Sequence, residues 1–190
     1  MRILAGLGNP GYEYALTRHN VGWMVIDQIV DDLRAGTPRE SFSSLSWGPL
    51  ISEGIRTLLL KPLTFMNLSG KAVAEAARYY AVPPEDILII CDDIALPFGA
   101  LRLRRKGSSG GQKGLESVLG AFRTLDIPRL RVGVGAQPEG RDRDAWVLGV
   151  FGRNEREILP DVIRRAADGC LSWMRMDIQK AMSVVNAPTS

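Results

Sequence analysis

Hydrophobic residues along the chain follow two spacings, and the change between them divides the sequence into strands and helices. A continuous apolar run over residues 2–8 (RILAGLG) predicts a buried strand that ends in glycines. From Val25 to Leu33 the apolar residues recur every three or four positions, which predicts an amphipathic helix. Asn20 is the expected N-cap residue of that helix, because its side chain could accept a bond from a free backbone N–H group.

Two further apolar runs, 45–52 and 55–60, predict a hairpin with Glu53 and Gly54 in the turn. The polar segment before them, residues 34–44, is predicted to be a loop. The chain therefore has at least three strands before its second helix.

That second helix is predicted over residues 71–81, where alanines are frequent and prolines follow shortly after the end. The next strand, residues 86–93, contains an uninterrupted apolar run over residues 87–91, a pattern typical of a strand buried on both faces of a sheet. It ends with Asp92 and Asp93. Ligand sites in α/β proteins usually lie at this carboxyl end of the strands.

The segment 99–107 alternates two leucines with two arginines, Leu101 and Leu103 with Arg102 and Arg104. Side chains in a strand point alternately to opposite faces, so the leucines share one face and the arginines the other. We predict a short strand with a basic outer face.

The second half of the chain continues the alternation of strands and helices. A glycine-rich stretch opens a helix within 108–122, a strand follows at 130–135, and residues from about 154 to 186 are mostly helical. Residues 135–146 are the best candidate for a mobile loop. This order predicts an α/β fold over residues 1–190: a single-domain three-layer sandwich with a twisted mixed β-sheet flanked by helices.

Composition narrows the class of protein. The chain has 190 residues, of which 45% are hydrophobic and 24% charged, as in globular proteins, and no apolar run is long enough to span a bilayer. The N-terminus lacks the features of a signal peptide, so we expect a cytoplasmic location. Cys91 and Cys170 are far apart, and with one histidine they offer no ligand set for zinc.

The glycines at the end of the first strand match the GxGxxG pattern of dinucleotide-binding proteins, as Gly6, Gly8 and Gly11. In those proteins an acidic residue ends the next strand. Here the nearby aspartates fall inside the predicted helix. The match is therefore weak, and we do not expect a nicotinamide or flavin cofactor.

Residues 107–111 (GSSGG) match the GxSxG pattern of α/β-hydrolases, in which the catalytic histidine follows the serine. His19 precedes Ser109, which excludes that fold. A triad of Ser109, His19 and Asp92 in another chain order stays open, because triads are defined by geometry. The simpler interpretation is that Ser109 is a small residue in a flexible loop.

The strongest charge feature is a basic cluster formed by Arg102, Arg104, Arg105 and Lys106, four cations within five residues. Charged edge strands also prevent aggregation, which is one explanation for such a cluster. A basic strand that leads into a glycine-rich helix start equally suits a phosphate backbone. On these features alone, nucleic acid and a solvated edge strand are both possible.

His19 is the only histidine in the chain, and its neighbours do not define its role. It could cap the following helix, or it could act as a base oriented by Asp92. Asn9 and Asn67 are similarly ambiguous, because asparagine favours turns and also binds carbonyl groups.

Four segments taken together resolve this ambiguity: GLGNPGYEYALTRHNVGW, KPLTFMNLSGKAV, DDIALPFGALRLRRKGSSGG and LRVGVG. They closely resemble the bacterial peptidyl-tRNA hydrolase family over nearly the whole chain. The resemblance implies a phosphorylase/hydrolase-like fold and an esterase that releases peptide from tRNA, recycling tRNA from stalled or aborted translation. It also implies a monomer that needs no metal, cofactor or obligate protein partner.

The same resemblance implies roles for individual residues. His19 would activate water, Asp92 would hold and stabilise the imidazole, and Asn9 would help to distinguish peptidyl from aminoacyl substrates. Contacts with the peptide and tRNA parts of the substrate would come from Tyr14, Phe65 and Asn67. The tRNA phosphates would be bound by Arg104 and Arg131.

This sequence departs from the family pattern in two places. Gln112 and Lys113 replace a histidine and an asparagine in the usual Gly-His-Asn-Gly, and Ala95 replaces a common acid. Lys113 could bind a phosphate or the terminal ribose instead. The altered segment keeps a second hypothesis open, namely a non-catalytic RNA-binding relative.

Overall fold

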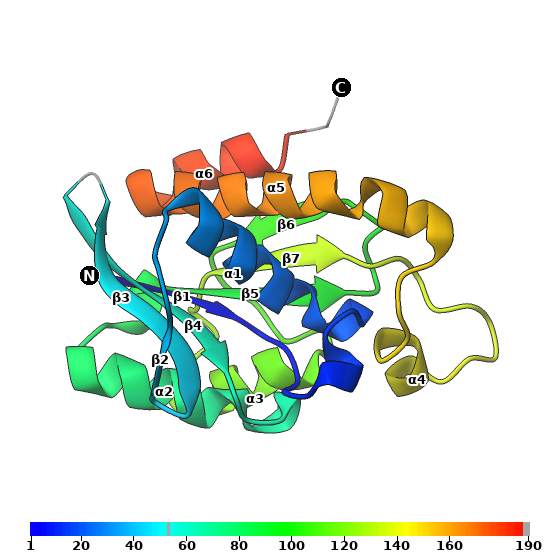
Figure 1. Ribbon diagram of the computed structural model, residues 1–190, viewed down its shortest axis with the longest axis horizontal. Helices are drawn as coiled ribbons and strands as arrows, with labels where there is room; N and C mark the ends of the chain where they lie inside the picture. The colour runs from blue at the N-terminus through cyan, green and yellow to red at the C-terminus, as the bar shows by residue number, and fades with distance from the viewer. Residues whose placement is uncertain (53, 188–190) are drawn as a thin grey trace.

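A computed structural model describes residues 1–52 and 54–187, and these form one seven-stranded mixed sheet with helices on both faces (Figure 1). The strand order is β2-β3-β4-β1-β5-β7-β6. The strands are β1 (Arg2–Gly6), β2 (Arg39–Ser41), β3 (Ser44–Ser52), β4 (Ile55–Pro62), β5 (Ile87–Asp93), β6 (Leu101–Arg104) and β7 (Arg129–Gly133). The helices are α1 (Val21–Asp32), α2 (Ser69–Tyr80), α3 (Lys113–Phe122), α4 (Arg143–Val147), α5 (Arg153–Arg175) and α6 (Ile178–Val185).

The centre of the sheet is parallel and its edges are antiparallel. Strands β4, β1, β5 and β7 run in the same direction, whereas β3 pairs antiparallel with β4, β2 with β3 and β6 with β7. Every residue of β5 is buried, as its uninterrupted apolar sequence predicts. The predicted three-layer mixed sandwich is confirmed.

Two hydrophobic cores fill the spaces between the layers. One lies between the sheet and helices α1, α5 and α6, and the other between the sheet and helices α2 and α3. Figure 1 shows α5 and α6 above the sheet and α2 and α3 below it. The leucines of β6 contribute to the first core: Leu103 is buried there, and Leu101 packs against it. The predicted alternation of β6 is confirmed, since Arg102 and Arg104 are exposed.

The predicted elements differ from the structure in three short segments. The hairpin of β3 and β4 is present, although Glu53 of its turn lies outside the described residues. Strand β2 occupies part of the segment predicted as a loop, because its polar residues 39–41 pair with residues 44–46 at the sheet edge. Helix α4 includes residues 143–146 of the segment predicted to be a mobile loop. The helical C-terminal region is interrupted between α5 and α6 by Met176 and Asp177.

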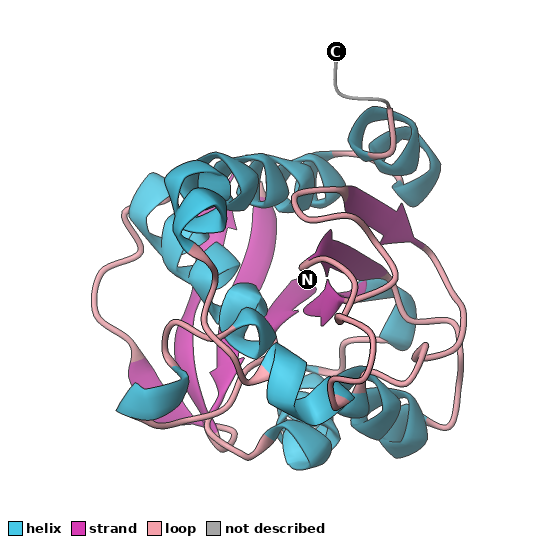
Figure 2. Ribbon diagram, turned by 90° about the vertical axis from the view of Figure 1, so that its right-hand side faces the viewer, coloured by secondary structure: helices cyan, strands magenta, loops and turns pink. Residues whose placement is uncertain are grey.

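A topological switch point lies where the chain leaves β1 and β5. These neighbouring parallel strands send the chain in opposite directions, since β1 is followed by the strands on one side and β5 by β7 and β6 on the other. Such a switch point opens a crevice at the carboxyl ends of the strands. Figure 2 looks onto this end, where α4 and several loops surround the carboxyl ends of the strands.

Helix α1 approaches the sheet unusually closely at this end. A side-chain Cβ at Gly6 of β1 would lie 2.2 Å from the Gly22 carbonyl oxygen, and one at Gly22 would lie 2.4 Å from the Ile90 oxygen. No Cβ atom fits at such distances, so only glycine is compatible with this packing. The contact places the start of α1, and the turn before it, directly against β1 and β5.

Candidate active site

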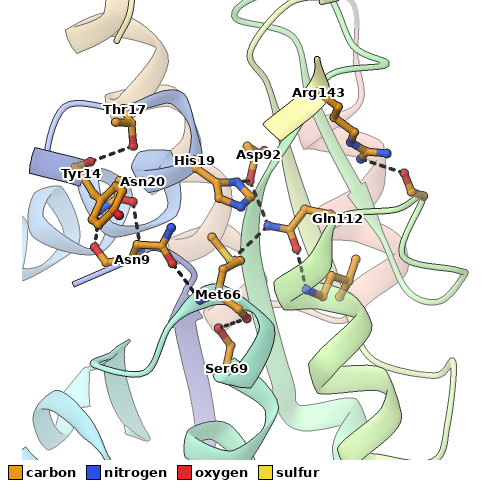
Figure 3. A network of polar contacts seen from close by, with 12 residues as sticks. Asn9, Tyr14, Thr17, His19, Asn20, Met66, Ser69, Asp92, Gln112 and Arg143 are labelled. Atoms are coloured by element: carbon orange, nitrogen blue, oxygen red, sulfur yellow. Dashed lines mark hydrogen bonds and ion pairs between the residues drawn. The ribbon is translucent and has the colours of Figure 1, made fainter. Parts of the chain in front are cut away.

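His19 and Asp92 meet at the switch point. His19 lies in a buried 3₁₀ turn, Arg18–Asn20, immediately before α1, and Asp92 is the second-last residue of β5. His19 Nδ1 lies 2.8 Å from Asp92 Oδ1, and both side chains are buried (Figure 3). An ionised carboxylate only accepts hydrogen bonds, so Nδ1 carries the proton and Nε2 of the neutral ring is left as the basic nitrogen. The predicted pairing of these two residues in space is confirmed.

Asn9 is held beside this pair by two backbone contacts. Its N–H donates to Asn20 Oδ1 at 2.9 Å, and its carbonyl accepts from Asn20 Nδ2 at 3.0 Å. Its own side-chain oxygen accepts from Met66 N at 2.8 Å, which leaves the amide nitrogen on the side of His19 (Figure 3). Asn20 stands at the N-cap position of α1, as predicted, but its side chain makes no capping bond and bonds the Asn9 backbone instead.

A cavity of about 210 Å³ opens in front of Asn9 and His19. Three other predicted site residues, Phe65, Asn67 and Lys113, line the same cavity. Asp92 lines an adjoining hollow, which it shares with His19. Phe65 is 58% exposed and presents a large apolar surface at the site. The remaining lining residues are Met66, Asp144, Val147 and Leu148.

Lys113 and Asp144 join the two sides of this cavity. Lys113 Nζ lies 2.5 Å from Asp144 Oδ2, and both side chains are 55% exposed. Lys113 is the first residue of α3, and Asp144 belongs to α4. Arg143 makes a second link from α4, because its Nη2 donates to the Gly110 carbonyl at 3.1 Å. The short helix α4 is thus fastened to the glycine-rich loop and to α3.

Arg18 holds α4 and the chain that follows it from the other side. Its guanidinium stacks 3.7 Å from the centre of the Trp146 ring, donates to the Val150 carbonyl at 2.6 Å and pairs with Glu155 at 2.7 Å. Burial lowers the pKa of Arg18, and Glu155 partly opposes that effect. Sequence reasoning missed this residue. An arginine beside the lone histidine gives no pattern that identifies it as a structural clamp.

Gln112 bonds the same carboxylate oxygen that His19 contacts. Its Nε2 donates to Asp92 Oδ1 at 2.9 Å, and its Oε1 accepts from Leu115 N at 2.6 Å (Figure 3). From the sequence it was notable only as a departure from the family pattern. Its position directly before α3 is the one signal that could have indicated a role.

Tyr14 comes from the loop that joins Asn9 to His19 (Figure 3). It ends a 3₁₀ turn, Tyr12–Tyr14, and its carbonyl accepts a hydrogen bond from Thr17 Oγ1 at 2.8 Å. This bond braces the loop that leads to His19. The backbone contact supports the site but does not test the predicted substrate contact of the ring.

The basic residues gather on one face of β6 and β7. Arg102 is paired in register with Arg131, and Arg104 with Arg129, so all four side chains emerge on the same face. Arg104 is exposed, whereas Arg131 Nε lies 2.9 Å from Asp93 Oδ2. Arg129 is buried and bonds backbone carbonyls, including that of Gly107 at 2.8 Å. Burial lowers the pKa of its guanidinium.

Ser109 occupies a different part of the surface. Its Oγ accepts a hydrogen bond from Gly111 N at 3.1 Å, and it lines a separate cavity of about 520 Å³ beside α3. His19 and Asp92 belong to other hollows. The structure therefore gives no support to a triad that includes Ser109.

Within the described ranges, no group of three or more histidine, cysteine, aspartate or glutamate side chains is arranged to hold a metal ion. In the same ranges, no helix combines the length and hydrophobicity required to cross a bilayer.

Comparison with known proteins adds independent information. The family model described as peptidyl-tRNA hydrolase matches residues 3–190. A curated peptidyl-tRNA hydrolase from Caldanaerobacter subterraneus is 44% identical over 98% of this chain and 100% of its own, and one from Brevibacillus brevis is 41% identical over 98% of each. The crystal structure of peptidyl-tRNA hydrolase from Acinetobacter baumannii superimposes with a TM-score of 0.90 at 33% identity, covering 98% of this chain and 95% of that one.

Proposed function

The chain belongs to the peptidyl-tRNA hydrolase family, and on this premise we propose that it cleaves the peptidyl-tRNA ester by a water mechanism centred on His19 and Asp92. The products are free peptide, or an N-blocked amino acid, and free tRNA, which can be reused after stalled or aborted translation. The observation that carries the mechanism is the 2.8 Å contact between His19 Nδ1 and Asp92 Oδ1 in a buried site beside an open cavity.

The chemical steps follow from this geometry. Nε2 of His19 takes a proton from water while the water oxygen attacks the ester carbonyl carbon. Asp92 stabilises the imidazolium that results, because its carboxylate faces the ring at hydrogen-bond distance. The tetrahedral intermediate then expels the ribose oxygen, which takes the proton back from the imidazolium. Water and ester are consumed, and a carboxylic acid and a ribose hydroxyl are formed.

The developing negative charge on the carbonyl oxygen requires hydrogen-bond donors. Asn9 and Asn67 are suited to this role, since both side chains line the cavity with His19. The bond from Met66 N to Asn9 Oδ1 orients the Asn9 carboxamide so that its nitrogen is available as a donor. In this scheme Asn9 recognises the peptide linkage close to the reacting ester.

The remaining predicted residues have roles in binding. Phe65 offers an exposed ring at the cavity for the peptide or the terminal base, and Tyr14, in the loop between Asn9 and His19, supplies a similar contact. Lys113 places an ammonium group at the cavity wall, where it can bind a phosphate or the terminal ribose. Arg104 and Arg131 bind tRNA phosphates farther along the basic face.

We further propose that the protein acts in the cytoplasm as a monomer, with residues 1–190 as one catalytic domain. In this proposal its partner is peptidyl-tRNA, bound through the acceptor end and the peptide. It needs no obligate protein partner, no metal and no cofactor, because the His19 and Asp92 pair supplies the base that the reaction requires.

The decisive experiment is hydrolysis of an N-blocked aminoacyl-tRNA by the wild type, His19→Ala and Ser109→Ala. We expect turnover by the wild type, near-complete loss in His19→Ala and full activity in Ser109→Ala. Undiminished turnover in His19→Ala would remove the assigned base. Loss of turnover in Ser109→Ala would favour a serine esterase, and binding of the tRNA without wild-type turnover would identify a non-catalytic RNA-binding protein.

A further inference from the structure

Gln112 connects the catalytic carboxylate to the start of α3. Its side chain is buried and lies between two fixed groups, Asp92 at the end of β5 and the first turn of the helix (Figure 3). Nε2 donates to Asp92 Oδ1 at 2.9 Å and approaches Met66 Sδ at 3.4 Å, while Oε1 accepts from Leu115 N at 2.6 Å. Both ends of the carboxamide are therefore engaged.

The two bonds also fix which end of the carboxamide faces Asp92. A backbone N–H can only donate, so the group that faces Leu115 N has to be the oxygen. The Nε2 group then points to Asp92, where a carboxylate oxygen can accept it. A carboxamide turned the other way would place two acceptors face to face and two donors face to face. The bond to Leu115 N thus fixes the Gln112 carboxamide in the orientation that donates a hydrogen bond to Asp92.

We propose that Gln112 is a positioning residue for the reaction. It holds Asp92 Oδ1 at the point where that atom meets His19 Nδ1, since the same oxygen accepts both bonds. This inference rests on the proposed function, in which Asp92 orients and stabilises the His19 ring. Without the Gln112 bond, the carboxylate is free to rotate about its last torsion and the imidazole loses its fixed direction.

Gln112 performs this task without adding a charge. The hollow that contains His19, Asp92 and Gln112 is also lined by Lys113, Arg143 and Asp144, which come from α3 and α4. Arg18 is adjacent to His19 in its turn, and Asp93 with its partner Arg131 lies next to Asp92. An amide donor stays neutral at every working pH, so it orients the carboxylate while these neighbours set the local field.

Two variants separate the bond to Asp92 from the helix cap. In Gln112→Asn the side chain is shorter by one methylene, so it can still cap α3 but cannot reach Asp92. In Gln112→Glu the length and the capping oxygen are kept, but the donor to Asp92 becomes a second carboxylate. Because asparagine is a preferred cap residue, Gln112→Asn should fold as stably as the wild type, which thermal unfolding checks.

Two measurements test whether the variants change the His19 and Asp92 pair. The first is the pH profile of kcat and KM with an N-blocked aminoacyl-tRNA. The second is a ¹⁵N NMR titration of the imidazole, which needs no turnover and has a single signal set because His19 is the only histidine. For Gln112→Asn we expect a fall in kcat of about tenfold with KM and Tm close to the wild type, since one buried bond to a charged group is lost.

For Gln112→Glu we expect the acidic limb of kcat/KM and the NMR midpoint to move upward together by about one pH unit, because a second carboxylate favours the imidazolium. Wild-type kcat in Gln112→Asn would overturn the proposal. So would an unmoved midpoint in Gln112→Glu, since Gln112 would then serve only as a cap. Absence of wild-type turnover would instead refute the proposed function, and the NMR titration would still test the contact with Asp92.

Discussion

Replacing Asp92 by asparagine removes the negative charge of the catalytic pair while keeping its shape. Two donors, His19 Nδ1–H and Gln112 Nε2–H, converge on Oδ1, so the amide introduced at this position has to present its oxygen to both. The hydrogen bonds and the direction of the imidazole ring are therefore retained. What changes is the stabilisation of the imidazolium that forms when water is deprotonated.

The size of this effect follows from the geometry of the pair. With roughly 4 Å between the two charge centres and an effective dielectric constant of about 20, their attraction is about 4 kcal/mol. This is an upper bound on the transition-state stabilisation lost, because the amide dipole retains part of it. Each ~1.4 kcal/mol corresponds to a factor of ten in rate. We expect kcat of Asp92→Asn to fall by about 10²- to 10³-fold, with little change in KM.

The assay is steady-state hydrolysis of an N-blocked aminoacyl-tRNA, with Asp92→Ala as the comparison. Alanine leaves both donors without an acceptor in a buried site, so it should lower Tm as well as kcat, whereas asparagine should lower kcat alone. If Asp92→Asn keeps more than a tenth of the wild-type kcat while His19→Ala is inactive, the carboxylate charge does not supply the predicted stabilisation of the imidazolium.

Three other predictions concern the basic face, the ion pair at the cavity and the thiols. Arg104→Ala should raise KM for the tRNA substrate several-fold and reduce the salt slope of log KM by about one, with kcat unchanged; an unchanged salt slope would contradict a phosphate contact. Lys113→Ala should raise KM while Asp144→Ala, which frees the ammonium, should not, and each should change stability by less than about 1 kcal/mol because the pair is half exposed. Equal KM effects would assign the pair to structure alone. Burial raises the pKa of the Cys91 and Cys170 thiols, so a thiol reagent at pH 8 should modify them only after unfolding; rapid modification of the native protein would refute this.

The sequence predicts best those elements in which the spacing of apolar residues shows which side chains are buried. The uninterrupted apolar run of β5 and the alternation of leucine and arginine in β6 each identify a strand and its buried side. The elements missed are short. Strand β2 has three residues that become a strand only because β3 lies beside them, and α4 is one turn and a half held by Arg18 and Lys113.

Some of the missed boundaries did carry a local signal. Asp142 precedes α4 and accepts from Ala145 N at 2.9 Å, and Asp177 begins α6 by accepting from Gln179 N and Lys180 N, each at 3.0 Å. Aspartate before a short helical segment is a common N-cap. However, aspartate is common in turns as well as at helix N-caps, so the sequence alone does not distinguish the two roles.

The candidate site divides in a similar way. His19, Asp92 and Asn9 could be assigned from the resemblance because their types and order match a known family. The supporting bonds of Gln112, Asn20 and Arg18 could not be assigned, since each depends on a partner far away in the chain. A bond between residues 20 positions apart, as between Asp92 and Gln112, leaves no periodicity in the sequence.

The contact between Gly6 and Gly22 gives the site a fixed point made of backbone alone. Because α1 rests on the sheet there without intervening side chains, the offset between the His19 turn and the end of β5 does not depend on the volume of the surrounding core. Exchanging one aliphatic residue for another elsewhere in the core should therefore change the stability of the fold but not the position of His19 relative to Asp92. A methyl group at position 6 or 22 would instead displace α1, and with it the His19 turn, relative to Asp92 at the end of β5.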